Sequence, residues 1–291
     1  MENMNNPTAL ITDSTCDIPQ DMLDQYGITV IPQVVVWGNE LLRDRIDLTA
    51  EEFYQRLEKD PVWPTSTLPS PTEFEKVFRD AIANGAKEIV MLTVSSAMSG
   101  TFQLAEQVGQ KMDVPVYVVD SKGPTMTLGW QVLAAARMRE AGGNADKMVK
   151  AAARVREKMV QIVCLDTLEY LRRGGRIGSA TRFIGSLLGI KPLVQINHKT
   201  GLVESCGLAR TRKKSIDTLV SRFFEQLAPD KPKRVAVLHG NALPEAQALA
   251  DRIKKEYKPL ELLINITGPV LGIHTGPRAL ALCGYTEESN S

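Results

Sequence analysis

The sequence has few aromatic residues and almost no charge excess. Phe, Trp and Tyr make up 5% of its 291 residues, and the formal net charge is +1. A dedicated nucleic-acid-binding protein usually carries a large positive excess, so this balance argues against a nucleic-acid partner. No run approaches the roughly 20 apolar residues of a membrane-spanning helix. The hydrophobic fraction is an ordinary 43%, so the cores must be built mainly from aliphatic residues and Met.

The cysteines and the opening residues indicate the compartment. The four cysteines lie far apart and form no CxxC pair: Cys16, Cys164, Cys206 and Cys283. This spacing is typical of reduced thiols. The opening MENMNNPTAL has neither a basic segment nor an apolar run, so we expect no cleaved signal peptide. We therefore expect a soluble, cytoplasmic protein.

Most catalytic and cofactor-binding motifs are missing. The sequence contains no H-E-x-x-H pair, Cys/His cluster, P-loop or G-x-G-x-x-G segment. Ser99 lacks the G-x-S-x-G elbow of many hydrolases, because Ala97 stands where the first glycine would be. We therefore expect a protein that is not an enzyme and has no catalytic residue or metal. The alternative is a small-molecule phosphotransferase or hydrolase.

Apolar runs alternate with helical patterns along the first half of the chain. Runs such as EIVMLTV and VPVYVVD are typical of a covered parallel sheet, and capping boxes open helices after Thr49 and Ser70. The second half adds a short helix around residues 183–188 and a hairpin around residues 198–201. We expect an α/β fold of two α/β domains. Residues 1–160 form a mostly parallel sheet, and residues 161–291 form a mixed one.

Three hydroxyl residues stand in a row in the segment PTSTLPSP. Thr65, Ser66 and Thr67 lie between prolines that fix the backbone, so their hydroxyls can be presented to an anionic oxygen. A plain loop leading to the helix cap at Ser70 explains the same residues.

A second group of hydroxyls, SSAMSGT, follows an apolar run. Ser95, Ser96 and Ser99 stand where a strand ends and a helix begins. Ligands of open α/β sheets bind at such strand ends, and helix N-termini attract anions. An ordinary helix cap explains these serines equally well.

His274 and two basic segments complete the candidate residues. A lone histidine is more often structural than functional, but His274 lies among glycines and a hydroxyl in IHTGP. Arg173 and Arg176 flank a Gly-Gly pair that could bind phosphate or simply end a helix. Arg210 and Arg212 belong to the run RTRKK at a helix start, where positive charge opposes the helix dipole. A surface that contacts a protein or a phosphate is therefore expected there.

The ordered set of motifs resembles the DegV family of bacterial fatty-acid-binding proteins. The matching segments run in order along nearly the whole chain: ITDSTCDIP, PTSTLPSP, SSAMSGTFQ, DSKGPTMTLG, LRRGGRIG, LARTRKKSI and IHTGPRAL. The resemblance implies a DegV-like, EDD-type fold. It also implies one long-chain fatty acid, such as palmitate or oleate, in a pocket between the two domains, with no other cofactor.

The resemblance further implies roles for the candidate residues. It assigns the carboxylate of the fatty acid to hydroxyl and imidazole side chains: Ser66, Ser99, Thr65, Thr67, Ser95, Ser96 and His274. It places Arg210 and Arg212 at a mouth that faces a partner, a fatty acid kinase. That kinase would phosphorylate the bound acid for phospholipid synthesis, and a transient membrane contact is compatible with this role.

Two positions depart from the family pattern. The loop reads S-T-L-P where T-S-Q-P is common, so Leu68 removes an amide. Arg278 stands in place of a usual glycine, where it either adds charge near the head group or lies at the surface. We also hypothesise that hydroxyls, backbone N–H groups and an imidazole hold the carboxylate without a fixed strong cation, so that it can be handed over.

Overall fold

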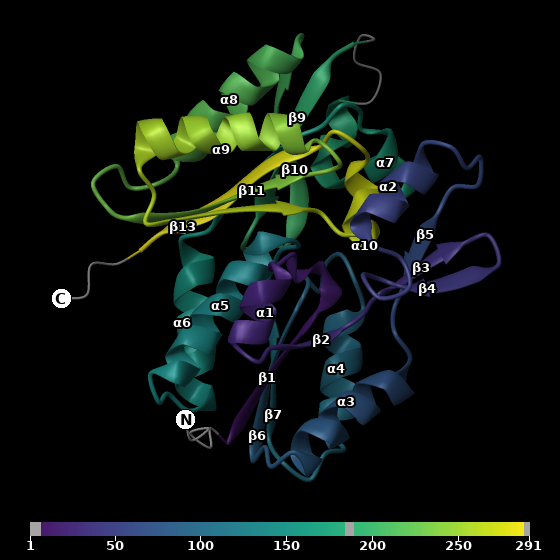
Figure 1. Ribbon diagram of the computed structural model, residues 1–291, viewed down its shortest axis with the longest axis vertical. Coiled ribbons are helices and arrows are strands. Elements are labelled where there is room, and N and C mark those ends of the chain that lie inside the picture. Colours follow the sequence, from purple (N-terminus) through teal and green to yellow (C-terminus); the bar gives the residue numbers. More distant parts are fainter. Residues whose placement is uncertain (1–6, 184–188, 288–291) are drawn as a thin grey trace.

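The structure is a computed structural model that describes residues 7–183 and 189–287. Its first part is built on a four-stranded sheet in which every pairing is parallel (Figure 1). The order is β2-β1-β6-β7, with β1 (Thr8–Asp13), β2 (Thr29–Ile31), β6 (Glu88–Thr93) and β7 (Val116–Asp120). The expected parallel N-terminal sheet is confirmed.

Helices cover both faces of this sheet. One face packs against α1 (Gln20–Gln25), α5 (Met126–Glu140) and α6 (Ala145–Glu157), and the other against α3 (Pro71–Ala83) and α4 (Thr101–Gly109). Successive strand residues enter opposite cores, as Leu10 and Ile11 do, because side chains alternate along a strand. The capping box at Ser70 opens α3 as predicted.

A small antiparallel sheet stands beside the parallel one. Its order is β4-β3-β5, with β3 (Val34–Trp37), β4 (Glu40–Arg43) and β5 (Thr65–Thr67). The segment Thr65–Thr67, expected as a loop, is therefore an edge strand that pairs with β3. The helix α2 (Ala50–Leu57) begins at the predicted capping box and packs with this sheet.

The second part is built on a six-stranded mixed sheet of order β10-β9-β8-β13-β11-β12. Its strands are β8 (Val160–Cys164), β9 (Lys191–Asn197), β10 (Leu202–Ala209), β11 (Lys233–His239), β12 (Glu261–Ile266) and β13 (Leu280–Thr286). Among the described strands of this sheet, only β11 and β12 pair in parallel, and β9 and β10 form the predicted hairpin. The expected mixed C-terminal sheet is confirmed. Since β8 opens it, we propose a domain boundary near residue 160.

The two faces of the mixed sheet have different neighbours. The helices α8 (Arg212–Glu225) and α9 (Leu243–Tyr257) cover one face, and the other face looks toward α5 and the parallel sheet (Figure 1). Along β8, Ile162 belongs to the core under α8 and α9, whereas Val163 belongs to the core shared with the first part. Because side chains alternate along β8, one strand contributes both to the core of the second part and to the core that the two parts share.

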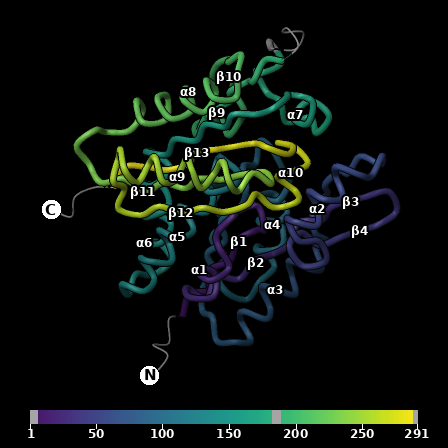
Figure 2. The backbone as a smooth tube through the Cα atoms, turned by 45° about the horizontal axis from the view of Figure 1, so that its top comes forward, coloured from purple at the N-terminus to yellow at the C-terminus, as the bar shows by residue number. Residues whose placement is uncertain are grey.

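Short helices connect the small sheet to the second part. The helix α10 (Pro269–Thr275) packs against α2, β3 and β5, and α7 (Glu169–Arg173) packs against α10 (Figure 2). A 3-10 helix spans Gly178–Phe183, and the short helix expected around residues 183–188 lies, beyond its first residue, outside the described residues. Every helix within residues 7–183 and 189–287 is too short or too polar to traverse a bilayer.

Candidate ligand-binding site

A cavity of about 330 Å³ lies between the carboxyl ends of the parallel strands and the inner face of the mixed sheet. This volume falls within the range of roughly 300–1,000 Å³ that is typical of small-molecule pockets. Aliphatic side chains on or beside the mixed sheet line much of it: Val163, Leu165, Val194, Ile196, Val203, Leu238, Ala279 and Ala281. This wall suits a hydrocarbon chain.

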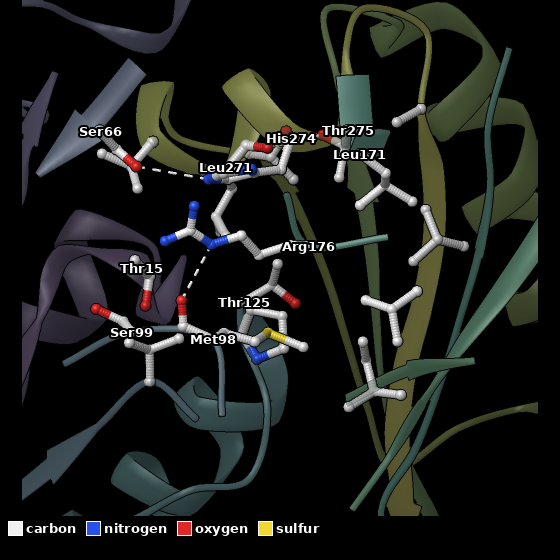
Figure 3. A pocket seen from close by; sticks show the side chains of 18 of the residues that line it. Thr15, Ser66, Met98, Ser99, Thr125, Leu171, Arg176, Leu271, His274 and Thr275 are labelled. Atoms are coloured by element: carbon white, nitrogen blue, oxygen red, sulfur yellow. Dashed lines mark hydrogen bonds between the residues drawn. The ribbon is translucent and has the colours of Figure 1, made fainter. Parts of the chain in front are cut away.

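Polar side chains gather at one end of the cavity. Ser66 of β5, His274 of α10 and Arg176 lie close together, and Ser99 approaches from the loop before α4 (Figure 3). Ser66 Oγ lies 3.5 Å from His274 Nε2. This end of the cavity therefore offers two hydroxyls, an imidazole and a guanidinium to an anionic group.

Arg176, which was predicted to contact a partner or a phosphate, is exposed and also lines the polar end of the cavity. Its guanidinium lines the cavity, where Nε donates to the Met98 carbonyl at 3.1 Å and Nη1 donates to the Gly174 carbonyl at 2.6 Å (Figure 3). The Gly174-Gly175 turn ends α7, as predicted, and Gly175 takes a φ of 69°. That turn brings Arg176 back toward the polar end of the cavity.

His274 is held as a neutral imidazole. Burial, followed by the positive charge of Arg176, lowers the pKa of His274 to about 4. Its Nδ1 is buried and has no hydrogen-bond partner among the described residues. Gly174 packs against this atom so closely that a Cβ there would lie 2.0 Å from it. Near neutral pH the ring can therefore donate or accept a hydrogen bond but adds no charge.

A chain of buried hydrogen bonds positions Ser99. Ser99 Oγ lies 2.8 Å from Thr101 Oγ1, which accepts from Gln33 Nε2 at 2.9 Å. The Gln33 N–H donates to Ser14 Oγ at 3.0 Å, and that hydroxyl donates to Asp44 at 2.6 Å. Burial raises the pKa of Asp44 to about 7. The chain ties the cavity wall to the core of the first part.

The turn after β1, for which the sequence predicted no role, also borders the cavity. Thr15 lines the cavity, and its hydroxyl donates to Asp13 at 2.5 Å. Asp13 also accepts from the Val94 N–H at 2.7 Å, so one buried carboxylate joins the loops after β1 and β6. Burial raises the pKa of Asp13. Both residues belong to the motif ITDSTCDIP, whose resemblance to the family was their only signal in the sequence.

The other predicted hydroxyls take different places. Thr67 lines the cavity at its exposed rim, whereas Thr65 is exposed and lies outside it. The Ser95 hydroxyl donates to the Gly201 carbonyl at 2.9 Å and so links the two parts of the chain. The Ser96 hydroxyl bonds to Asp120. Neither Ser95 nor Ser96 lines the cavity, so the structure gives both serines bonds to the protein instead.

The remaining predicted arginines lie outside the cavity. Arg212 is partly buried and forms a two-pronged ion pair with Glu245, with N–O distances of 2.9 and 3.0 Å. Arg173 pairs with Glu169 and lies over the Trp63 ring at 4.1 Å. Arg210 is exposed. Arg212 is thus held in an ion pair, whereas Arg173 and Arg210 are exposed.

The structure also shows where the two departures from the family pattern, Leu68 and Arg278, lie. Leu68 lines the cavity and adds apolar surface near Ser99. Arg278 is exposed with a φ of 60°, a region that favours glycine, and its guanidinium lies 3.7 Å from Asp166 and 3.8 Å from Glu245. Arg278 thus joins a surface charge cluster and does not line the cavity.

These features define a two-part α/β protein with an amphipathic cavity: a hydrocarbon-lined interior and a polar end with one cation. The described residues contain no group of His, Cys, Asp and Glu side chains that could hold a metal ion. The chain belongs to the DegV family, whose model, described as that of an uncharacterised protein family, matches residues 7–287.

Individual relatives agree with this assignment. A DegV domain-containing protein of Streptomyces coelicolor is 38% identical over 285 residues, covering 96% of this chain and 98% of its own. A structure described as fatty acid binding of a DegV family protein from Thermus thermophilus has a TM-score of 0.90 and 32% identity, with 96% and 99% of the chains covered. DegV of Bacillus subtilis, described as a fatty acid binding protein, has a TM-score of 0.88 and 30% identity, covering 96% and 99%.

Proposed function

We propose that this protein binds one long-chain fatty acid, with the acyl chain in the cavity and the carboxylate at the end formed by Ser66, Ser99, Arg176 and His274. The observation that carries the proposal is the joining of an aliphatic wall and this polar end in a single cavity. The relatives from Thermus thermophilus and Bacillus subtilis, described as binding fatty acids, support it.

The energetics suit such a ligand. A C16 acid buries about 14 methylenes, which at roughly 0.8 kcal/mol each contribute on the order of 11 kcal/mol before entropy costs. The acyl chain therefore supplies the affinity. The carboxylate must be compensated when it leaves water, and Arg176 with the two hydroxyls provides charge-assisted hydrogen bonds for it.

The direct test is to identify the bound lipid. Solvent extraction and mass spectrometry of the purified protein should release a stoichiometric fatty acid, with palmitate and oleate as the first candidates. After delipidation, palmitate should bind more tightly than hexadecanol, because the alcohol leaves Arg176 without an anion. Reproducible absence of a bound acid, together with no binding of added palmitate, oleate or octadecanoate, would disprove the proposal.

We further propose that the carboxylate is presented to a partner fatty acid kinase in the cytoplasm, and that the acyl phosphate then serves phospholipid synthesis. Thr67 and Arg176 place the polar end near the surface, and the exposed Arg210 and Arg173 offer positive charge for a partner or a phosphate. In this reaction a carboxylate oxygen attacks the γ-phosphorus of ATP, and ADP leaves. Labelled ATP, a purified fatty acid kinase and the palmitate-loaded protein should yield acyl phosphate only when all three are present.

A hydrolase is the competing function, since Ser66 and His274 are neighbours. A serine nucleophile needs a base whose other nitrogen is oriented by a third group. The Nδ1 atom of His274 has no such partner within the part of the chain that the structure describes, and Gly174 occupies the space beside it. Ester turnover by the isolated protein would favour the hydrolase.

A further inference from the structure

Two further polar side chains line the cavity besides those described above. Gln161 of β8 and Thr125, which precedes α5, both line the cavity, and they are only 2% and 4% exposed. Gln161 stands within the apolar run MVQIVCL and faces the cavity because strand alternation puts it on the same side as Val163.

Gln161 lies on the distal part of the cavity. From Gln161, β8 runs toward Leu165 and then to α7, which packs against the helix that carries His274. Four residues of strand span roughly 13 Å at about 3.3 Å per residue. An acyl chain whose carboxylate lies beside His274 therefore reaches Gln161 only with carbons well along its length.

The hydrogen bonds around these groups are incomplete. Gln161 Oε1 accepts from Thr127 Oγ1, whereas no described residue hydrogen-bonds to Gln161 Nε2. Thr125 Oγ1 is buried and also has no partner within the described chain. Thr125 and Thr127 stand two positions apart at the start of α5, so the bond from Thr127 to Gln161 keeps the two unsatisfied groups in the same region of the cavity.

The backbone of Thr125 supports a specific role. Its φ of 54° and ψ of −140° are rare for a β-branched residue, and such conformations concentrate at ligand-binding positions. A plain methylene chain would leave both this hydroxyl and the Gln161 amide without partners. Buried polar groups that lose water without gaining a partner penalise the complex.

We propose that the cavity is built for a long-chain carboxylic acid that carries a hydroxyl or carbonyl oxygen on the distal part of its chain. This inference rests on the proposed function and names its ligand class. The Gln161 amide donates to the ligand oxygen. The Thr125 hydroxyl donates to a carbonyl or accepts from a ligand hydroxyl, so both buried groups become satisfied. An acid without that oxygen still buries its chain but leaves both groups without a partner, so it forgoes this part of the binding free energy.

The wild-type protein provides the first test. After delipidation, its Kd is measured for octadecanoate, 3-hydroxyoctadecanoate, 12-hydroxyoctadecanoate and 12-oxooctadecanoate. We expect the acids with a distal oxygen to bind at least as tightly as octadecanoate and roughly tenfold more tightly than the 3-hydroxy acid, a difference of about 1.4 kcal/mol. Tighter binding of octadecanoate than of every distal-oxygen acid would overturn the inference alone. Failure to bind any of the four would overturn the proposed function with it.

Variants give the second test. Gln161→Leu should weaken 12-hydroxyoctadecanoate binding about tenfold and strengthen octadecanoate binding several-fold, and Thr125→Val should shift the ratio the same way. The control Gln195→Leu makes the same change on the neighbouring strand β9, outside the cavity, and should leave the ratio unchanged. Equal effects of Gln161→Leu on both acids would contradict the inference. If Gln161→Leu does not fold, the wild-type series still decides.

Discussion

Ser66 and His274 are 208 positions apart in the chain, yet Ser66 Oγ lies 3.5 Å from His274 Nε2. The serine belongs to β5 of the small sheet and the histidine to α10, which packs on that sheet. Arg176 arrives from a third segment, after α7. The polar end of the cavity is thus assembled from distant parts of the chain, and each of them can be tested separately.

Removing the Ser66 hydroxyl should weaken fatty-acid binding without unfolding the protein. Loss of one hydrogen bond to a carboxylate costs about 1–2 kcal/mol, so Ser66→Ala should raise the Kd for palmitate roughly 5- to 30-fold. Thr65→Ala changes the neighbouring, exposed residue of the same strand and should leave the Kd within about twofold. Isothermal titration of delipidated protein measures both, and equal losses would show that β5 acts only as scaffold.

Arg176 should discriminate between an acid and an alcohol. A charge-assisted hydrogen bond contributes about 1.5–3 kcal/mol, so Arg176→Gln should weaken palmitate binding by roughly 10- to 150-fold and hexadecanol binding far less. Arg172→Gln removes a nearby exposed arginine that pairs with Glu169 and serves as the control. A parallel loss for palmitate and hexadecanol would mean that Arg176 supports the cavity wall and not the carboxylate.

His274 should titrate abnormally and respond to ligand. Its pKa of about 4 lies below the ordinary histidine value, so its neutral form stabilises the fold. That contribution is complete above about pH 6.5 and is lost as the pH falls through about 4, because the unfolded chain binds the proton first.

A bound carboxylate favours the protonated ring, so palmitate should raise the pKa of His274. NMR titration of the imidazole resonances measures this shift. His198 is the internal control, since burial lowers its pKa to about 4 as well, but it lies at the β9–β10 turn and does not line the cavity. A pKa of His274 that stays fixed on palmitate addition would place the carboxylate elsewhere.

Gly174 should be required for the position of the His274 ring. Gly174 has ordinary helical backbone angles, but a Cβ there would lie 2.0 Å from His274 Nδ1. Gly174→Ala should therefore displace the ring and weaken palmitate binding at least tenfold. Gly175→Ala adds a methyl group with no atom within 4 Å, at a positive φ. It should lower the melting temperature slightly and leave binding nearly intact. If Gly174→Ala binds palmitate as tightly as the wild-type protein does, the position of the His274 ring is not needed for binding.

Local signals predicted much of the fold. The capping boxes at Thr49 and Ser70 and the hairpin before Leu202 each depend on a few adjacent residues, and all three are confirmed. The segment Thr65–Thr67 was wrongly predicted as a loop, because its strand exists only by pairing with β3. Strand alternation then turns Thr65 away from the side that Ser66 occupies.

The site was predicted less completely than the fold. Motif order pointed to Ser66, Ser99 and His274, which the structure brings to one end of the cavity. The Gly-Gly turn before Arg176 was predicted, but its position relative to the cavity depends on how α7 packs on α10, which adjacent residues do not specify. Gln161 is a single polar residue in an otherwise apolar strand, which is visible in the sequence. Whether it lines the cavity depends on which face of the sheet meets the cavity, and the sequence does not show that.

The bond from the Ser95 hydroxyl to the Gly201 carbonyl joins the two parts of the chain at one place, and an acid in the cavity would join them at another. Such an acid acts as a removable crosslink. Its binding and the docking of the two parts are linked equilibria, so each must strengthen the other by the same factor. Any partner that separates the two parts therefore lowers the affinity for the acid. A partner can then release the lipid by weakening the contacts between the two parts.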